Sequence, residues 1–177
     1  LKEFAAGIAQ LKVYFTADIV WPADEVWTPI EGYTGEVHGQ GFKITGLNAP
    51  FFGTTAATLI DDLHLENVNI VDNEKYRIGA LACDLNATSV KVSNCSVSGS
   101  MSIGYTGTTR MEIGGMIGYV YNAAKVTSTF SNLKSSINIT STSTANAQAN
   151  YAGVVSYPAY GFVKDCQFTG SITLGEN

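Results

Sequence analysis

The stretch NCSVSGSMSI (residues 94–103) returns near the end of the chain as DCQFTGSITL (residues 165–174), and this repetition decides the fold. The two stretches agree in character at every position. Both have cysteine second and glycine sixth, with apolar residues fourth, eighth and tenth. Apolar residues that alternate with polar ones predict a half-buried β-strand, because successive side chains on a strand point to opposite faces.

Three other stretches fit the same frame, namely VHGQGFKI (37–44), LHLENVNI (63–70) and FSNLKSSINI (130–139). Counted from Leu63, the copies recur after 32, 35 and 36 residues (95 − 63, 130 − 95 and 166 − 130). Aligned, they predict three columns of inward-facing residues. The columns are Val37, Leu63, Cys95, Phe130 and Cys166; Phe42, Val68, Met101, Ile137 and Ile172; and Ile44, Ile70, Ile103, Ile139 and Leu174.

A short apolar segment that begins with small residues precedes each later copy, as in GALA (79–82) and GGMIG (114–118). Self-similarity at this period, with several strands in each unit and no helical pattern between them, is typical of a solenoid. The sequence therefore predicts an all-β domain, a right-handed parallel β-helix of about four to five rungs. The expected rungs of this single domain, residues 1–177, are residues 13–47, 50–70, 78–103, 113–139 and 151–174.

The two ends of the chain differ in pattern. Residues 1–12, LKEFAAGIAQLK, space their apolar side chains as on one face of a helix, which predicts a short helix that caps the first rung. No comparable segment follows SITLGEN (171–177). We therefore expect the chain to be part of a longer polypeptide with other domains.

Composition narrows the possible partners. The net charge is −5 and the ten basic residues are scattered, which argues against binding to nucleic acid. No apolar run reaches the roughly 18 residues of a membrane-spanning helix. We expect a glycan or a host surface protein as partner and an extracellular or cell-surface location, and no cofactor is predicted.

The chain has three cysteines, and their odd number excludes a complete disulfide framework. Cys95 and Cys166 fall in the same inward column with Phe130 between them. Two strand spacings separate their Cα atoms by about 9–10 Å, beyond the roughly 7 Å that a disulfide spans. The alignment predicts two buried free thiols.

His38 and His64 each follow a residue of the first column. On adjacent rungs, two imidazoles with Glu36 or Glu66 could hold a divalent metal ion. The competing interpretation is a polar ladder on a solvated sheet face, which we favour because a third ligand would have to come from the inward side.

Tyr119 and Tyr157 lie at matching positions, four residues after Gly115 and Gly153, with Tyr121 and Tyr160 nearby. Aromatic rings on a rigid scaffold could stack against sugar rings, so these four tyrosines are candidate glycan ligands. The alternative is a structural aromatic stack that shields the core at a corner.

At WTPIEGYTGEVHGQGFKITGLNAPFFG (27–53) the chain resembles the GLUG-repeat family of bacterial, Bacteroidetes-type, surface and secreted proteins. The resemblance rests on Trp27–Ile30, Tyr33–Gly35, Gly39–Leu47 and the PFFG segment. It departs from the family at Pro50, where the family has glycine. The resemblance implies an extracellular β-solenoid module without catalytic residues.

We therefore expect a non-enzymatic, adhesin-like surface module for adhesion, glycan binding or rigid spacing. The alternative is a polysaccharide lyase or glycoside hydrolase on the same scaffold. That alternative needs carboxylates or cations in register on neighbouring rungs, and candidates such as Asp61, Asp62, Lys75, Arg77 and Arg110 do not recur in that way. No catalytic residue is predicted.

Overall fold

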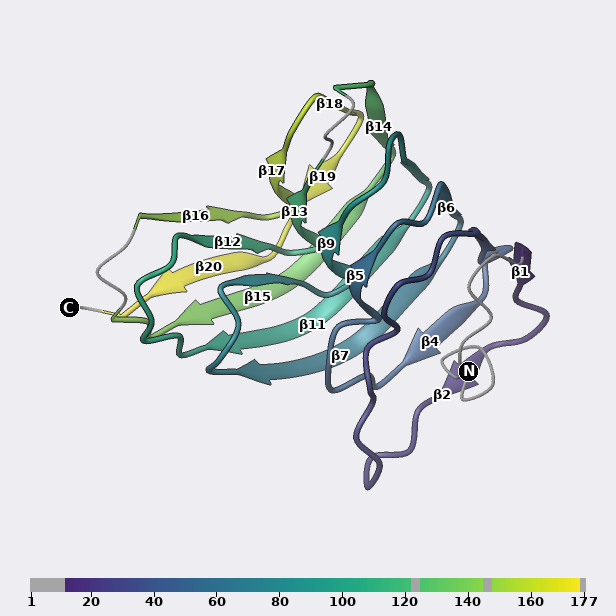
Figure 1. The fold of residues 1–177 in the computed structure, drawn as a ribbon. Coiled ribbons are helices and arrows are strands. Elements are labelled where there is room, and N and C mark those ends of the chain that lie inside the picture. The colour runs from purple at the N-terminus through teal and green to yellow at the C-terminus, as the bar shows by residue number, and fades with distance from the viewer. Residues whose placement is uncertain (1–11, 122–124, 145–147, 176–177) are drawn as a thin grey trace.

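The computed structural model describes residues 12–121, 125–144 and 148–175, and every helix or strand in these residues is a β-strand. The strands pair in parallel throughout this part of the chain. They form four sheets, and in each sheet the strands from successive turns of the chain lie side by side (Figure 1). The described residues contain no helix long and apolar enough to cross a membrane.

The strands are assigned to the four sheets as follows. The first sheet contains β1 (Lys12–Tyr14), β3 (Glu36–His38), β6 (Leu59–Asp61), β10 (Lys91–Ser93), β14 (Ser128–Ser131) and β18 (Gly161–Lys164). The second contains β2 (Ile19–Val20), β4 (Lys43–Thr45), β7 (His64–Asp72), β11 (Ser96–Ile103), β15 (Lys134–Ser141), β19 (Gln167–Phe168) and β20 (Ser171–Leu174). The third contains β8 (Arg77–Gly79), β12 (Met111–Gly114) and β16 (Ala149–Ala152). The fourth contains β5 (Phe52–Thr55), β9 (Ala82–Leu85), β13 (Ile117–Val120) and β17 (Val155–Pro158).

From β6 onwards the chain visits the sheets in a fixed order, so β6, β7, β8 and β9 are followed by β10, β11, β12 and β13. Ile60, Val92, Phe130 and Val163 are successive partners in the first sheet. They are 32, 38 and 33 residues apart (92 − 60, 130 − 92 and 163 − 130). The predicted all-β class with parallel strands is confirmed. The helix predicted over residues 1–12 lies outside the described residues except for Lys12, which begins β1.

A polar residue with positive φ marks the passage from the first sheet to the second in each coil. Asp62, Asn94, Asn132 and Asp165 have φ values of 52°, 57°, 52° and 53°. Asn and Asp adopt this left-handed conformation more readily than other non-glycine residues because their short side chains bond locally. The Asn132 side-chain amide also donates to Asn94 Oδ1 at 2.7 Å. The first residue of the repeated stretch therefore turns the chain.

The first predicted column mixes two columns of the structure. Leu63, Cys95, Leu133 and Cys166 follow the four turning residues, and backbone hydrogen bonds connect them through Ser96, Lys134 and Gln167. Phe130 pairs instead with Val92 and Val163, and Val37 pairs with Ile60. Leu133, not Phe130, therefore separates the two cysteines.

All three cysteines are free, which agrees with the prediction of free thiols at Cys95 and Cys166. Cys83 and Cys95 are buried, and desolvation raises the pKa of each thiol to about 12. Cys166 is only partly buried, so its predicted burial is wrong.

On part of their length, the second and third predicted columns differ by two residues from the strand register of the structure. Met101 pairs with Ile70 and Ile139, not with Val68, and Ile172 pairs with Ile139. The cause is a register shift between Val97 and Gly99, where β7 carries one more residue than β11. Gly99 occupies the position opposite Val68 with φ 127°, and an added Cβ there would meet the Val68 backbone. The bulge therefore lies in β7, where Asn67 has φ 50°, and β11 continues through Gly99 opposite it.

The core contains aromatic rings at its N-terminal end and aliphatic side chains further along. Trp27 stacks on Phe51 with ring centroids 5.8 Å apart, and Phe51 meets Phe52 edge to face at 4.7 Å. The Trp27 indole N–H donates to the Pro50 carbonyl at 3.0 Å, which satisfies its buried polar group. By contrast, the last coil leaves Phe162 67% exposed.

Candidate functional site

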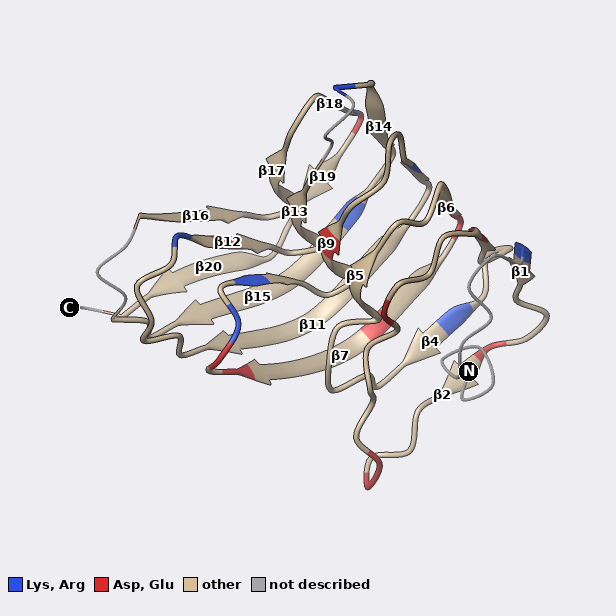
Figure 2. Ribbon diagram, viewed as in Figure 1, with Lys and Arg blue, Asp and Glu red and all other residues tan. Residues whose placement is uncertain are grey.

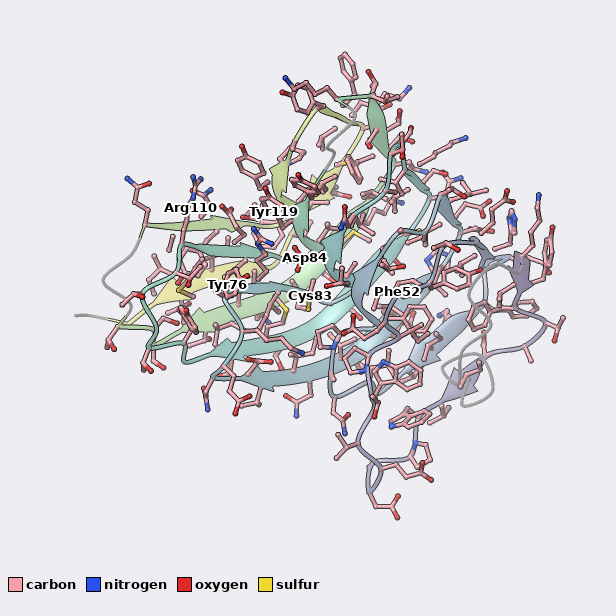
Figure 3. The ribbon with its side chains drawn as sticks, in the orientation of Figure 1. Phe52, Tyr76, Cys83, Asp84, Arg110 and Tyr119 are labelled. Atoms are coloured by element: carbon pink, nitrogen blue, oxygen red, sulfur yellow. The ribbon has the colours of Figure 1, made fainter. Side chains whose placement is uncertain are left out.

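A pocket of about 240 Å³ opens where the third sheet meets the fourth. Its lining includes one tyrosine, one cysteine, two basic and three acidic residues, namely Tyr76, Cys83, Lys75, Arg77, Glu31, Glu74 and Asp84. Figure 3 shows Tyr76, Cys83 and Asp84 close together at this junction, with Tyr119 and Arg110 beyond them. The pocket thus combines an aromatic surface with hydrogen-bond donors and acceptors.

Two rows of outward-facing residues lead away from this pocket along the coils. Arg77, Glu112 and Asn150 are successive partners on β8, β12 and β16. Thr54, Asp84, Tyr119 and Tyr157 are successive partners on β5, β9, β13 and β17. We call Arg77, Asp84, Arg110, Glu112, Tyr119 and Tyr157 the Arg–Tyr corner.

Glycines at the ends of β8 and β12 bring the two rows together. An added Cβ on Gly79 would meet the Ala82 carbonyl oxygen at 2.6 Å, and one on Gly114 would meet the Ile117 carbonyl oxygen. Only residues without a side chain allow the main chain to turn this tightly. The two rows consequently approach each other across the turn.

Arg77 connects the two rows. Its Nη1 donates to Asp84 Oδ1 at 3.0 Å, and its guanidinium lies over the Tyr119 ring, 3.8 Å from the centroid. The same group lies 5.2 Å from the Tyr76 centroid. Its Nε is buried and makes no hydrogen bond within the described part of the chain. This cation is held by one carboxylate and two aromatic rings.

A second contact between an arginine and a tyrosine ring lies one coil further along. The Arg110 guanidinium lies 5.6 Å from the Tyr157 centroid, and the rings of Tyr119 and Tyr157 stack at 5.1 Å with an interplanar angle of 11°. Tyr121 stacks beside Tyr119 at 6.5 Å. Because Arg77 and Tyr157 cover the Tyr119 ring, its faces are not free for a sugar.

Glu112 is the most buried charged group of the Arg–Tyr corner, with 4% of its surface exposed. Arg110 Nε donates to its Oε1 at 2.9 Å. Its Oε2 accepts the Asn150 side-chain amide at 2.9 Å and the Ser156 hydroxyl at 3.2 Å. Ser156 lies on β17, so this carboxylate also connects the third sheet with the fourth.

Burial and charge act in opposite directions on Asp84. Desolvation raises the pKa of this carboxyl, and the nearby Arg77 lowers it by a smaller amount. The negative charge of Glu31 raises it further. The Glu31 Oε2 accepts the Thr54 backbone N–H, which places this second carboxylate beside Asp84's strand partner. Two of the three acidic residues that line the pocket, Glu31 and Asp84, therefore lie beside Thr54.

The structure brings together three of the four candidate tyrosines. Tyr119, Tyr121 and Tyr157 stack in one group, as their matching spacing predicts. Tyr160 is 55% exposed and turns the chain between β17 and β18 with φ 53°. Its backbone carbonyl accepts from Ser128 of the first sheet, and no ring contact is found for it in the described residues.

The two candidate metal-binding histidines lie on successive coils, as predicted, but on different sheets, so they are not register partners. His38 lies on β3 of the first sheet, stacks on Tyr14 at 4.5 Å and contacts Asp61 at 2.8 Å. His64 lies on β7 of the second sheet and hydrogen-bonds Ser96 at 2.8 Å. The described residues contain no group of three or more His, Cys, Asp or Glu side chains that could hold a metal ion. The corner at Asp62 separates the two sheets, and the sequence frame placed both histidines in one column.

Sequence reasoning missed the charged half of this site. It considered Lys75 and Arg77 only as candidates for the lyase alternative, whereas Arg77 begins β8, is partly buried and contacts two tyrosine rings. A signal was available in the repeat itself. RIGA (77–80), EIGG (112–115) and NYAG (150–153) align on their small residues, which puts Arg77, Glu112 and Asn150 in one row.

Comparison with known proteins found one family model, the M26 IgA1-specific metallo-endopeptidase N-terminal region, which matches residues 28–99. Neither the curated proteins nor the solved structures gave a match. The matched segment covers less than half of the chain. It includes Glu31, Thr54, Tyr76, Arg77 and Asp84, which surround the pocket.

This match corrects two expectations. The family model found over residues 28–99 is that of the peptidase region and not of the GLUG-repeat family. The inferred bacterial surface-protein class rested on that resemblance and loses its support with it. The prediction of a non-enzymatic protein is also contradicted, because the matched region belongs by name to a metallo-endopeptidase.

Proposed function

We propose that this chain is a right-handed parallel β-helix of about four to five rungs that serves as a ligand-recognition module of a larger extracellular or cell-surface protein. The fixed order in which successive coils visit the four parallel sheets supports the helical architecture. The likeness of residues 28–99 to the N-terminal region of an endopeptidase supports a place beside a peptidase domain.

The ligand that we propose for the pocket is a short glycan. The observation that carries this proposal is the pocket itself, in which a tyrosine ring lies next to fixed carboxylate acceptors and a guanidinium donor. Sugars present C–H faces that stack on rings and hydroxyls that both donate and accept, so they complement such a mixed surface. The Arg–Tyr corner then acts as the rigid wall that holds Arg77 and Asp84 in place.

A polypeptide ligand is the second candidate, and one finding favours it. The matched peptidase family is by its name specific for IgA1, a protein substrate. An extended peptide with an arginine or lysine side chain would bring a positive charge towards Glu31 and Asp84 in the pocket.

The test is a binding screen of the 177-residue chain against soluble oligosaccharides, with Tyr76→Ala and Arg77→Met as pocket variants. We expect at least one glycan to bind, and each variant to weaken it about tenfold, corresponding to about 1.4 kcal/mol. Thr127→Ala, at an exposed position before β14 of the first sheet, is the matched control and should leave the affinity unchanged. Wild-type protein that binds no glycan, or pocket variants that bind as wild type, would refute the glycan assignment.

A further inference from the structure

On one part of the outer face of the second sheet the exposed side chains are short and uncharged, and all but Val71 are polar. Asn69, Ser100, Asn138 and Ser171 are successive partners across β7, β11, β15 and β20. Val71, Ser102, Thr140 and Thr173 form the next row along the same strands. All eight residues are exposed, whereas the residues that alternate with them on β15 are buried. The two rows therefore lie on the solvent side of the sheet. We call these eight residues the neutral face.

The neutral face carries no ionised side chain, although the chain as a whole has 25 Lys, Arg, Asp and Glu residues (10 + 15). Figure 2 shows the broad arrows of β11, β15 and β20 free of charge over most of their length, with Lys134 at the start of β15. Charges gather instead around β5, β8 and β9 and towards the N-terminal strands (Figure 2). A charged partner therefore has no counter-charge on the neutral face.

Hydrogen bonds between coils connect the four polar side chains of the first row in two pairs. The Ser100 hydroxyl donates to Asn69 Oδ1 at 3.2 Å, and the Ser171 hydroxyl donates to Asn138 Oδ1 at 2.9 Å. These bonds use hydroxyl donors and amide oxygens, and they leave the Nδ2 groups of both asparagines directed away from them. Short side chains on a hydrogen-bonded sheet also lose little conformational entropy when a ligand binds.

We propose that the neutral face binds an extended neutral polysaccharide along the coil axis. Donors and acceptors recur along that axis about every 4.8 Å, the strand spacing, and across it about every 6.7 Å, two residues of a strand. An extended chain of β-linked sugars also repeats its hydroxyls at short regular intervals. Each neutral hydrogen bond contributes little after water is displaced, but four consecutive coils offer the same contact repeatedly.

Other classes of partner fit this face less well. Nucleic acids and acidic glycans need basic side chains, and this face has none. A protein or membrane surface would need apolar area, and Val71 is the one large apolar side chain among the eight residues. The proposal does not depend on the pocket at the Arg–Tyr corner, which lies on different sheets.

The experiment is co-sedimentation of the chain with insoluble cellulose, xylan and chitin as neutral probes and with immobilised polygalacturonate as an anionic one. The test variant is Asn138→Asp with Thr140→Asp, which adds two charges to the neutral face and keeps a side-chain oxygen at the position where Oδ1 accepts from the Ser171 hydroxyl. The control is Asn86→Asp with Thr88→Asp, which adds the same charge at exposed positions after β9. Ser100→Asp, on β11, is a second test variant, and urea unfolding verifies that each variant is folded.

We expect binding to at least one neutral polymer, a loss of tenfold or more in affinity in both test variants, and wild-type binding in the control. Three results would overturn the proposal. They are wild-type protein that sediments with none of the neutral polymers, test variants that bind as wild type, and binding that is lost in Tyr76→Ala but kept in the test variants. The last result would assign the polymer to the pocket.

Discussion

The Arg–Tyr corner and the neutral face are outer surfaces of the same coils, yet they are built in opposite ways. At the corner, long charged and aromatic side chains from two sheets meet across a tight turn and bond to one another. On the neutral face, short side chains of one flat sheet point outward in parallel and contact mainly the next coil. Sheet geometry decides whether outer residues support the fold, so substitutions at the two surfaces should differ in their effect on stability.

The largest effect is expected at the turn that forms the corner. Gly114→Ala places a methyl group against the Ile117 carbonyl oxygen, which is main chain and cannot rotate away. We expect a loss of about 3 kcal/mol in the free energy of unfolding, the upper part of the usual range for overpacking. Urea denaturation followed by circular dichroism measures this loss. Gly104→Ala is the control, because its methyl would meet the end of the Asn73 side chain, which can move.

Loss of the buried carboxylate should have the next largest effect. Glu112→Ala leaves Arg110, Asn150 and Ser156 without their common acceptor. Hydrogen bonds to charged groups typically contribute about 1.5–3 kcal/mol, so we expect a loss of about 2 kcal/mol. Glu112→Gln keeps the shape and should recover part of the loss. Equal stability of Glu112→Ala and wild type would show that the corner does not support the fold.

The repeat in the sequence predicts the strands and their parallel order because burial of alternate residues leaves a direct mark on the apolar pattern. It cannot predict register where a glycine fills an inward position, as Gly99 does opposite Val68. An alignment of apolar residues then matches Val68 with Met101 instead of with Gly99. A one-residue insertion such as that at Asn67 has the same effect, since it shifts the frame without changing the alternation on either side.

The site was less predictable than the fold for a related reason. Tyr119 and Tyr157 share a row, and their spacing in the sequence places them there. The contact between Arg77 and Tyr119 depends on the angle between two sheets. Gly79 and Gly114 permit the tight turn between these sheets, but a glycine in the sequence does not say at which angle the sheets meet. The separation of His38 from His64 likewise depends on the corner at Asp62.

The tyrosine stack should make a moderate contribution to stability. Tyr119→Ala removes ring contacts with Tyr121 and Tyr157 and uncovers the Arg77 guanidinium. Aromatic pairs and cation–π contacts each contribute about 0.5–1.5 kcal/mol, so we expect a loss of about 1–2 kcal/mol. Tyr160→Ala, whose ring is exposed and outside the stack, is the control and should unfold like wild type. The urea midpoint measures both, and a larger effect of Tyr160→Ala would contradict the described stack.

A smaller effect is expected from the pH dependence of Asp84. Its pKa is raised in the folded chain because burial outweighs the attraction of Arg77. Its contribution to stability is therefore present below the unfolded-state pKa of about 3.9 and is lost as the pH rises through the higher folded-state value. Asp84→Asn removes this titration, so its stability relative to wild type should improve between acidic and neutral pH. Urea midpoints of both proteins at the two pH values test this, and a relative change of opposite sign would contradict the stated balance.

The smallest effect is expected on the neutral face, and it completes the comparison. Ser102→Ala and Thr140→Ala remove exposed hydroxyls for which no side-chain hydrogen bond is found within residues 12–121, 125–144 and 148–175. Exposed substitutions of this kind usually change the free energy of unfolding by no more than about 0.5 kcal/mol. We expect unchanged urea midpoints, together with weaker binding if the face holds a polysaccharide. A loss as large as that of Tyr119→Ala would mean that these hydroxyls support the sheet, and it would remove the proposed division between the two surfaces.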